Sequence, residues 1–206
     1  MPNTEAAQFW NERFKTEDFI FGVEPNEYLK EKASEFLKAN QNILCVADGE
    51  GRNSVYLAKQ GLSVDAFDVS DVAVEKARGL AQKAKVQVNF SIEDCDTWSW
   101  TPNQYDAVLA IFVQFADPQM RQRLFENLQE TLKPGGILVL LGYTQKQLEY
   151  KTGGPVSIEY LYTEDMLKMA FSEMKILELQ SYEKELSEGA RHRGMSALVG
   201  MVARKI

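Results

Sequence analysis

Short apolar runs alternate with amphipathic stretches through the middle of the chain, from residue 42 to residue 143. Five of the runs have the length and composition of buried strands, at 43–47, 63–68, 86–91, 105–112 and 137–143. Helical patterns fill the intervals at 53–60 and 71–85 and begin again at residue 118. Strands that are apolar throughout and alternate with helices predict a mostly parallel sheet with helices on both faces.

Residues that begin and end helices support these boundaries. Asp117 is a good N-cap, and Pro118 fits the first helical position, where its missing N–H is harmless. Leucines at 124, 128 and 132 recur at a spacing of four, which places them on one helix face. The Lys-Pro-Gly-Gly sequence at 133–136 then ends this helix and leads into the strand at 137–143.

The two ends of the chain have other patterns. Residues 4–14 look helical, with Trp10 and Phe14 on one face. Near the C-terminus we expect a helix at 163–171 and strands at 174–181 and 196–204, joined by a polar loop at 182–194. With the last strand antiparallel, these elements predict an α/β three-layer sandwich with a seven-stranded sheet. We expect a single domain over 1–206, in which residues 1–40 form an N-terminal helical cap.

Composition and charge restrict the class of protein. The 206 residues are 45% hydrophobic and 26% charged, as expected of one ordinary globular domain. A net charge of −7 without a basic run argues against a nucleic-acid or membrane-surface partner. The apolar runs are too short to span a bilayer. Cys45 and Cys95 have no metal-ligand or disulfide spacing, so we expect no metal and a reducing, cytoplasmic location. We also expect a monomer or weak homodimer.

The loop after the first strand has the residues of an adenosine site. Gly49 and Gly51 allow a sharp turn and a close approach of backbone to ligand, although such a loop is also typical of a plain tight turn. Asp68 ends the second strand 19 residues after Gly49, where an acid binds ribose hydroxyls. Asp94 follows the third strand. The dinucleotide pattern would need glycine at Ser54, which argues against a nicotinamide dinucleotide.

Several motifs resemble one family in order along nearly the whole chain. Residues 43–53 resemble motif I of class I S-adenosylmethionine (SAM)-dependent methyltransferases, and the GEGRN segment resembles the tellurite-resistance and thiopurine methyltransferase-like branch. Six further segments also resemble that family, at 10–14, 21–26, 67–70, 93–94, 132–136 and 189–203. The resemblance implies a Rossmann-like fold and SAM as cofactor, with S-adenosylhomocysteine as product. It implies cofactor contacts from Trp10, Arg13, Ala47, Asp48, Gly49, Glu50, Gly51, Arg52, Asn53, Asp68, Val69, Ser70, Glu93, Asp94, Cys95 and Phe112.

Motif I departs from the family at two positions. Cys45 stands where the family has an acid, and Ala47 replaces its first glycine. Asp48 is our candidate to stand in for the missing acid. These changes bear on the detailed contacts to SAM more than on its binding.

Candidate catalytic residues come from three places at the same end of the sheet. Gln114 follows the fourth strand, Tyr143 ends the fifth, and His192 and Arg193 lie in the polar loop before the last strand. Histidine is a base near neutral pH and arginine holds anions, and the family's Glu-Gly-x-x-His-x-Gly stretch is matched from Glu188 to Gly194. The plainer alternatives are a solvated turn for the loop and a satisfied polar residue for Gln114.

A Gly-Gly-Pro turn followed by aromatic residues at 144–162 is interpreted as a substrate-side lid, or alternatively as a surface loop that covers apolar area. We therefore expect a SAM-dependent methyltransferase that acts on a small molecule, such as a thiol or a metalloid oxyanion. A SAM-binding module without catalysis is one alternative, and a nicotinamide-dependent oxidoreductase is a weaker one.

Overall fold

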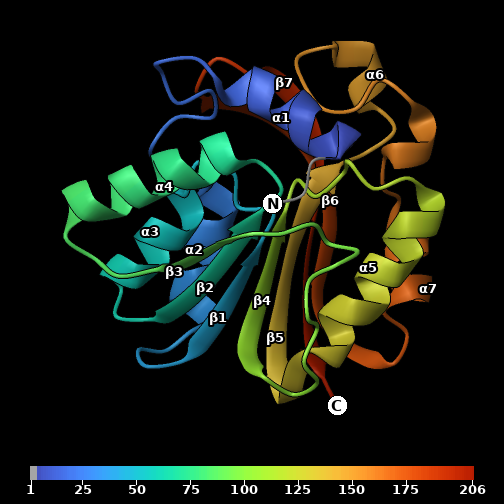
Figure 1. Ribbon diagram of the computed structural model, residues 1–206. Coiled ribbons are helices and arrows are strands. Elements are labelled where there is room, and N and C mark those ends of the chain that lie inside the picture. The colour runs from blue at the N-terminus through green and yellow to red at the C-terminus, as the bar shows by residue number, and fades with distance from the viewer. Residues whose placement is uncertain (1–3) are drawn as a thin grey trace.

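A seven-stranded sheet runs through the middle of the computed structural model, which describes residues 4–206 (Figure 1). The strand order is β3-β2-β1-β4-β5-β7-β6. Strands β1 to β5 pair in parallel, whereas β7 runs antiparallel to both of its neighbours, β5 and β6. The predicted α/β architecture is confirmed. The strand bounds are Asn42–Val46 (β1), Ser63–Asp68 (β2), Asn89–Ile92 (β3), Tyr105–Ile111 (β4), Leu132–Tyr143 (β5), Met174–Glu188 (β6) and His192–Lys205 (β7).

Five helices begin at a residue whose side chain caps them. The side chains of Thr4, Ser70, Asp117 and Thr163 each accept a hydrogen bond from a backbone N–H three residues further on. Asn26 caps a helix in the same way. The helix bounds are Glu5–Phe14 (α1), Glu27–Phe36 (α2), Arg52–Lys59 (α3), Asp71–Ala84 (α4), Pro118–Glu130 (α5), Gln147–Tyr150 (α6) and Glu164–Ala170 (α7), with a 3-10 turn at Ile158–Tyr160 (η1).

The core has two layers because alternate residues of a strand face opposite sides of the sheet. Leu44 and Val46 of β1 lie in the cluster that includes residues of α5 and α7. Ile43 and Cys45 lie in the opposite cluster, with residues of α2 and α3. Cys45 is therefore a core residue in an apolar layer, which suits a thiol better than the acid it replaces.

Three boundaries differ from the predictions. The polar stretch expected as a loop at 182–194 is mostly strand, since β6 continues to Glu188 and β7 begins at His192. Its polar residues are tolerated because β6 is an edge strand with much of its length exposed. The third strand begins at Asn89 rather than at residue 86, because residues 85 and 86 still bond to the end of α4. The fifth strand includes the 132–136 stretch, with a register shift opposite β4.

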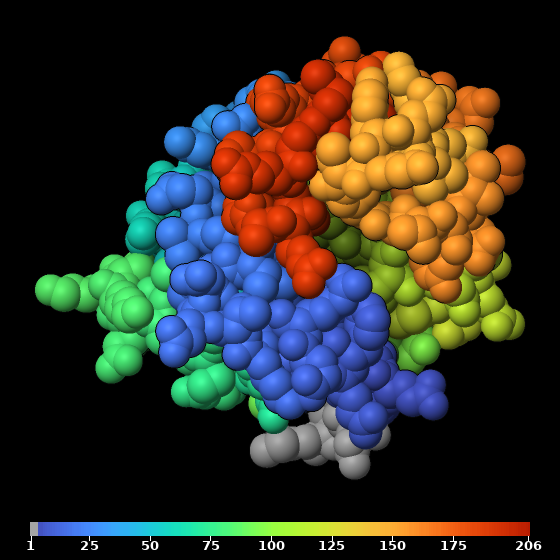
Figure 2. Space-filling model, turned by 90° about the horizontal axis from the view of Figure 1, so that it is seen from above, coloured from blue at the N-terminus to red at the C-terminus, as the bar shows by residue number. Residues whose placement is uncertain are grey.

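Three segments gather at the carboxyl ends of the parallel strands, the upper end of the sheet in Figure 1. Figure 2, seen from above, shows the N-terminal segment in blue, the turn between β6 and β7 in red and the segment at 144–162 in orange, side by side around a hollow. Backbone bonds join the first two, since the Ile20 carbonyl accepts from the N–H of Ala190 at 2.9 Å. No helix among the described residues is long and apolar enough to cross a membrane.

Candidate functional site

The loop between β1 and α3 turns sharply at the carboxyl end of the sheet. Ala47 has φ of +48°, a left-handed conformation in which a side chain is uncommon. It occupies the place of the glycine in the resembled motif, in a conformation that glycine adopts readily. Gly51 has φ of +87°, and a Cβ there would lie 2.6 Å from Cβ of Ala77. Glycine therefore lets α3 begin directly against α4.

Asp68 holds this loop against the end of β2. Its Oδ2 accepts from the N–H of Gly49 at 2.9 Å, and its Oδ1 accepts from the N–H of Ser70 at 2.9 Å. Burial raises the pKa of Asp68 to about 6. Each carboxylate oxygen has a second lone pair, so both remain able to accept from ribose hydroxyls.

Two other acids of the loop, Asp48 and Glu50, have different partners. Burial raises the pKa of Asp48 to about 7, while its carboxyl group accepts from the hydroxyl of Ser54. The other acid, Glu50, forms an ion pair with Lys76 of α4 at 2.7 Å through Oε1. Oε2 of Glu50 is buried without a hydrogen-bond partner. An orphaned acceptor in this loop fits a ligand that brings a donor, as the amino group of SAM would.

Helix α1 covers the loop. The ring of Phe14 lies 3.5 Å from the position that a Cβ on Gly49 would take, and it stacks on Trp10 at a centroid distance of 5.7 Å. The hydroxyl of Ser70 donates to Oδ1 of Asn11 at 2.6 Å, which fixes α1 to the start of α4. Arg13 lies over the ring of Phe9, and burial, with a contribution from Arg191, lowers its pKa.

The segment after β3 closes the other side of the loop. The N–H of Glu93 donates to the Asp68 carbonyl at 3.0 Å, and Asp94 accepts at Oδ1 from the N–H of Asp96 at 2.9 Å. Cys95 is buried, and burial raises the pKa of its thiol, so it is a poor nucleophile at neutral pH. Val69 is half-buried at the end of β2.

A cage of aromatic rings encloses His192 beside this loop. The His192 side chain is 10% exposed, and its ring centroid lies 4.5 Å from Phe21, 4.5 Å from Phe112 and 5.8 Å from Tyr143. Phe112 has φ of +58°, a strained conformation, and stacks on Tyr143 at 4.8 Å. Burial lowers the pKa of His192 below its ordinary 6.5. The ring is therefore neutral at pH 7 and able to accept a proton.

Of the remaining predicted residues, Gln114 and Asn53 form side-chain hydrogen bonds within the protein, and Arg193 is exposed. Gln114 is buried, accepts from the N–H of Tyr143 at 2.5 Å and donates to the carbonyls of Tyr143 and Tyr160 at 2.9 Å each. Both of its N–H donors are thus used. Arg193 is exposed, on the opposite face of β7 from His192. Asn53 accepts from the N–H of Asn26 at 3.0 Å.

Sequence reasoning did not single out several residues of this region. The side chain of Glu188, which is 9% exposed, lies beside Arg52, whose Nη2 donates to it at 2.8 Å. Arg52 Nη1 donates to the carbonyl of Phe21 at 3.1 Å. Asn11 and Asn26 also contribute bonds. The Glu-Gly-x-x-His pattern was the available signal for Glu188, but the contact with Arg52 spans 136 residues and leaves no local trace in the sequence.

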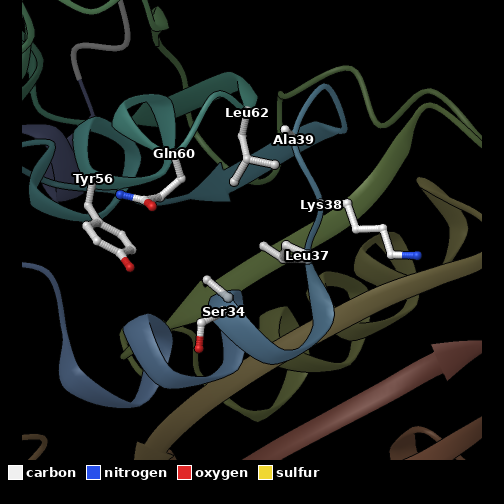
Figure 3. A pocket seen from close by; sticks show the side chains of 8 residues that line it. Ser34, Leu37, Lys38, Ala39, Tyr56, Gln60 and Leu62 are labelled. Carbon is white, nitrogen blue, oxygen red and sulfur yellow. The ribbon is translucent and has the colours of Figure 1, made fainter.

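Two hollows lie elsewhere on the molecule. One of about 170 Å³ lies between α2 and α3, near the start of β1, lined by residues that include Leu37, Tyr56 and Leu62 (Figure 3). A more open one of about 540 Å³ lies between the segment after β5, the start of α7 and the β6–β7 pair. The first hollow is at the opposite end of the sheet from Asp68 and His192, so neither of these residues lines it. Among residues 4–206, no group of three or more potential ligands is placed to hold a metal.

Comparison with known proteins finds a matching family and several relatives of this sequence. Residues 43–136 match the model of a family described as a methyltransferase domain. The chain is 24% identical over 228 residues to the tRNA N(3)-methylcytidine methyltransferase Mettl2 of Drosophila melanogaster, covering 93% of this chain and 68% of the relative. It is 31% identical over 124 residues to thiocyanate methyltransferase 1 of Brassica oleracea, covering 58% of this chain and 53% of the relative. The chain thus spans about half the length of that second relative.

Solved structures share the fold at low sequence identity. TehB from Haemophilus influenzae has a TM-score of 0.73 at 17% identity, over 98% of this chain and 67% of TehB. The N-methyltransferase NodS from Bradyrhizobium japonicum, solved with S-adenosylhomocysteine, has a TM-score of 0.71 at 15% identity, over 98% of this chain and 99% of NodS. At these identities the likeness concerns the fold.

Proposed function

We propose that the chain is a SAM-dependent methyltransferase that methylates a small molecule held beside His192. SAM supplies an electrophilic methyl group: a lone pair of the acceptor forms the new bond to carbon, the electrons of the broken carbon–sulfur bond remain on sulfur, and the acceptor loses a proton. The residues of this chain bind both partners, align them and remove that proton.

Residues of β2, the β1–α3 loop, α1 and the segment after β3 would bind SAM. Asp68 would accept the ribose hydroxyls, and the backbone from Ala47 to Gly51 would lie against the methionine portion. Trp10 and Phe14 would cover the cofactor from the side of α1, and Glu93, Asp94 and Cys95 would line the adenine. The orphaned Oε2 of Glu50 supports a cationic ligand group near the loop.

The observation that carries the choice of acceptor is the enclosure of His192. Rings from the N-terminal segment, the end of β4 and the end of β5 surround the imidazole, and the His192 side chain is 10% exposed. A base with so little exposed surface is easier to reach for a compact molecule than for a polynucleotide. The net charge of −7 supports the same choice. We therefore favour a small molecule over a tRNA, although tRNA methyltransferases are among the relatives.

Within this proposal the segment at 144–162 is the acceptor's lid. A Cβ on Gly154 would meet the ring of Tyr143 at 2.7 Å, and one on Gly153 would lie 3.8 Å from Cδ2 of His192. The two glycines thus pack directly on the cage. Gln114 acts by position, because it holds Tyr143 to Tyr160 of this segment. Arg193 is exposed at the same end of the sheet, on the face of β7 opposite His192, where its charge would attract an acceptor that carries an anionic group away from the reacting atom.

We also place the chain in the tellurite-resistance and thiopurine methyltransferase-like branch. The support is the Glu188-to-Gly194 pattern together with the GEGRN segment, and the fold shared with TehB is compatible with it. The two free, buried cysteines support a cytoplasmic location.

A turnover assay tests the proposal. The chain is incubated with SAM and one of four acceptors: a small benzylic thiol, tellurite, a primary amine or bulk tRNA. Production of S-adenosylhomocysteine is measured. We expect turnover with a small molecule and none with tRNA. Turnover with tRNA alone would overturn the acceptor assignment, and SAM binding without turnover on any acceptor would favour a binding module.

A further inference from the structure

The carboxylate of Glu188 connects His192 to the cofactor loop. Its side chain is 9% exposed, and Oε1 accepts from Nδ2 of Asn26 at 2.9 Å. Oε2 accepts from Nη2 of Arg52 at 2.8 Å and lies 3.6 Å from Nδ1 of His192. Asn26 caps α2 and Arg52 begins α3. Three segments far apart in the sequence therefore meet on one buried carboxylate.

The charges at this meeting point follow from its surroundings. Burial alone would raise the pKa of Glu188, but His192 and Arg52 together lower it below its ordinary 4.5. The pKa of His192 is lowered by burial, against the pull of Glu188. At neutral pH the pair is thus an ionised carboxylate facing a neutral imidazole.

A neutral imidazole carries one proton, on either of its two nitrogens. A carboxylate only accepts hydrogen bonds, so the nitrogen that faces it is the one stabilised as a donor. Nδ1 is buried and has no other hydrogen-bond partner. Its separation of 3.6 Å from Glu188 is longer than a hydrogen bond, as is common at such sites before the substrate binds.

We propose that Glu188 is a positioning residue that keeps the proton of His192 on Nδ1 and leaves the lone pair of Nε2 for the acceptor. This inference rests on the function proposed above, since it assigns His192 to the proton of the acceptor. During transfer that proton moves to Nε2, Glu188 stabilises the resulting imidazolium, and the proton then leaves to water.

The tautomer of His192 with its proton on Nδ1 limits which class of acceptor the ring can assist. A lone pair on Nε2 recognises a molecule that brings a proton to it, namely a thiol or another protic nucleophile. An acceptor that is already a deprotonated oxyanion would gain nothing from this histidine. The aromatic rings around the imidazole favour an apolar or aromatic body attached to that group. We therefore expect the benzylic thiol, which keeps its proton at pH 7, to be the best substrate of the panel above.

A purely structural role for Glu188, as the counter-charge of Arg52, makes a different prediction. In that case removal of the carboxylate changes stability but leaves the imidazole proton where it was. The position of that proton is measurable, because His192 is the single histidine of the chain. A tag-free, 15N-labelled sample gives the two nitrogen signals of one ring, and their shifts identify the protonated nitrogen without SAM or acceptor present.

The spectrum is recorded at pH 8 for the wild-type chain, Glu188→Gln, Glu188→Asp and the control Glu185→Gln. Glu185 lies on the same strand and is exposed. We expect protonated Nδ1 in the wild type, in Glu188→Asp and in the control. In Glu188→Gln the amide donates to Nδ1, so the proton should move to Nε2. The same variant should lose about 10²–10⁴-fold in kcat, the usual range for a general base, with the SAM Kd changed less than about two-fold.

Two results would overturn the inference: a wild-type ring protonated at Nε2, or a Glu188→Gln ring with the wild-type tautomer. If Glu188→Gln does not fold, the wild-type and Glu188→Asp spectra still decide between the tautomers. Failure of the proposed function has a separate signature, which is protonated Nδ1 in a wild-type chain without turnover on any acceptor.

Discussion

The backbone N–H of Gly49 donates to Oδ2 of Asp68 at 2.9 Å, and this bond joins the β1–α3 loop to the end of β2. The two residues are 19 positions apart and lie on adjacent parallel strands or just beyond them. The same carboxylate is our candidate for the ribose hydroxyls. Asp68 would therefore have two roles, since it holds the β1–α3 loop in place and would bind the ribose.

Replacement of this carboxylate should weaken SAM binding. Asp68→Ala removes a charged acceptor from the ribose hydroxyls and a partner from two backbone N–H groups, so we expect a loss of about 1–3 kcal/mol in binding. Titration calorimetry measures the affinity, and thermal unfolding of the same sample separates it from misfolding. An unchanged Kd in a folded variant would remove Asp68 from the site.

Ala47 should be a source of strain. Its φ of +48° is readily adopted by glycine, so Ala47→Gly should raise the free energy of unfolding by about 0.5–1 kcal/mol. The matched control is Ala58→Gly inside α3, which should lower stability by about 1 kcal/mol. Urea denaturation measures both. Equal losses in the two variants would show that the Ala47 methyl group contributes packing that outweighs its strain.

Asp48 should make stability depend on pH. Burial raises its pKa to about 7 in the folded chain, against an ordinary 3.8. Because the folded-state pKa is the higher one, its stabilising contribution is complete below pH 3.8 and declines as pH rises towards 7. Asp48→Asn cannot ionise, so its stability relative to the wild type should increase from pH 4 to pH 7 by about 1–3 kcal/mol. Parallel stability curves would contradict this.

His192 should set the acidic limb of the rate profile. Burial lowers its pKa below 6.5, so kcat/KM should rise with pH as the ring loses its proton and reach a plateau by about pH 7. In His192→Ala the rate should fall and this limb should disappear, with little change in SAM affinity. A His192→Ala profile that keeps the wild-type limb would assign the limb to another group.

The sequence was sufficient for features that depend on local patterns. Caps such as Asp117 and Thr163, the parallel strands and the proximity of Gly49 to Asp68 all follow from spacing and periodicity. Contacts of high sequence separation were not predictable, as with Arg52 and Glu188. The continuation of β6 through polar residues was missed because an edge strand does not need an apolar pattern.

The bond between the Ile20 carbonyl and the N–H of Ala190 has a consequence for synthesis of the chain. The cage around His192 takes Phe21 from near the N-terminus and the histidine itself from a strand that ends at Lys205. Strands β1 to β4 have their sheet partners once residue 143 has emerged from the ribosome, whereas β5 waits for β7 and this cage waits for residue 192. A chain truncated before β7 would keep the cofactor loop and Asp68 and lack every contact that His192 makes.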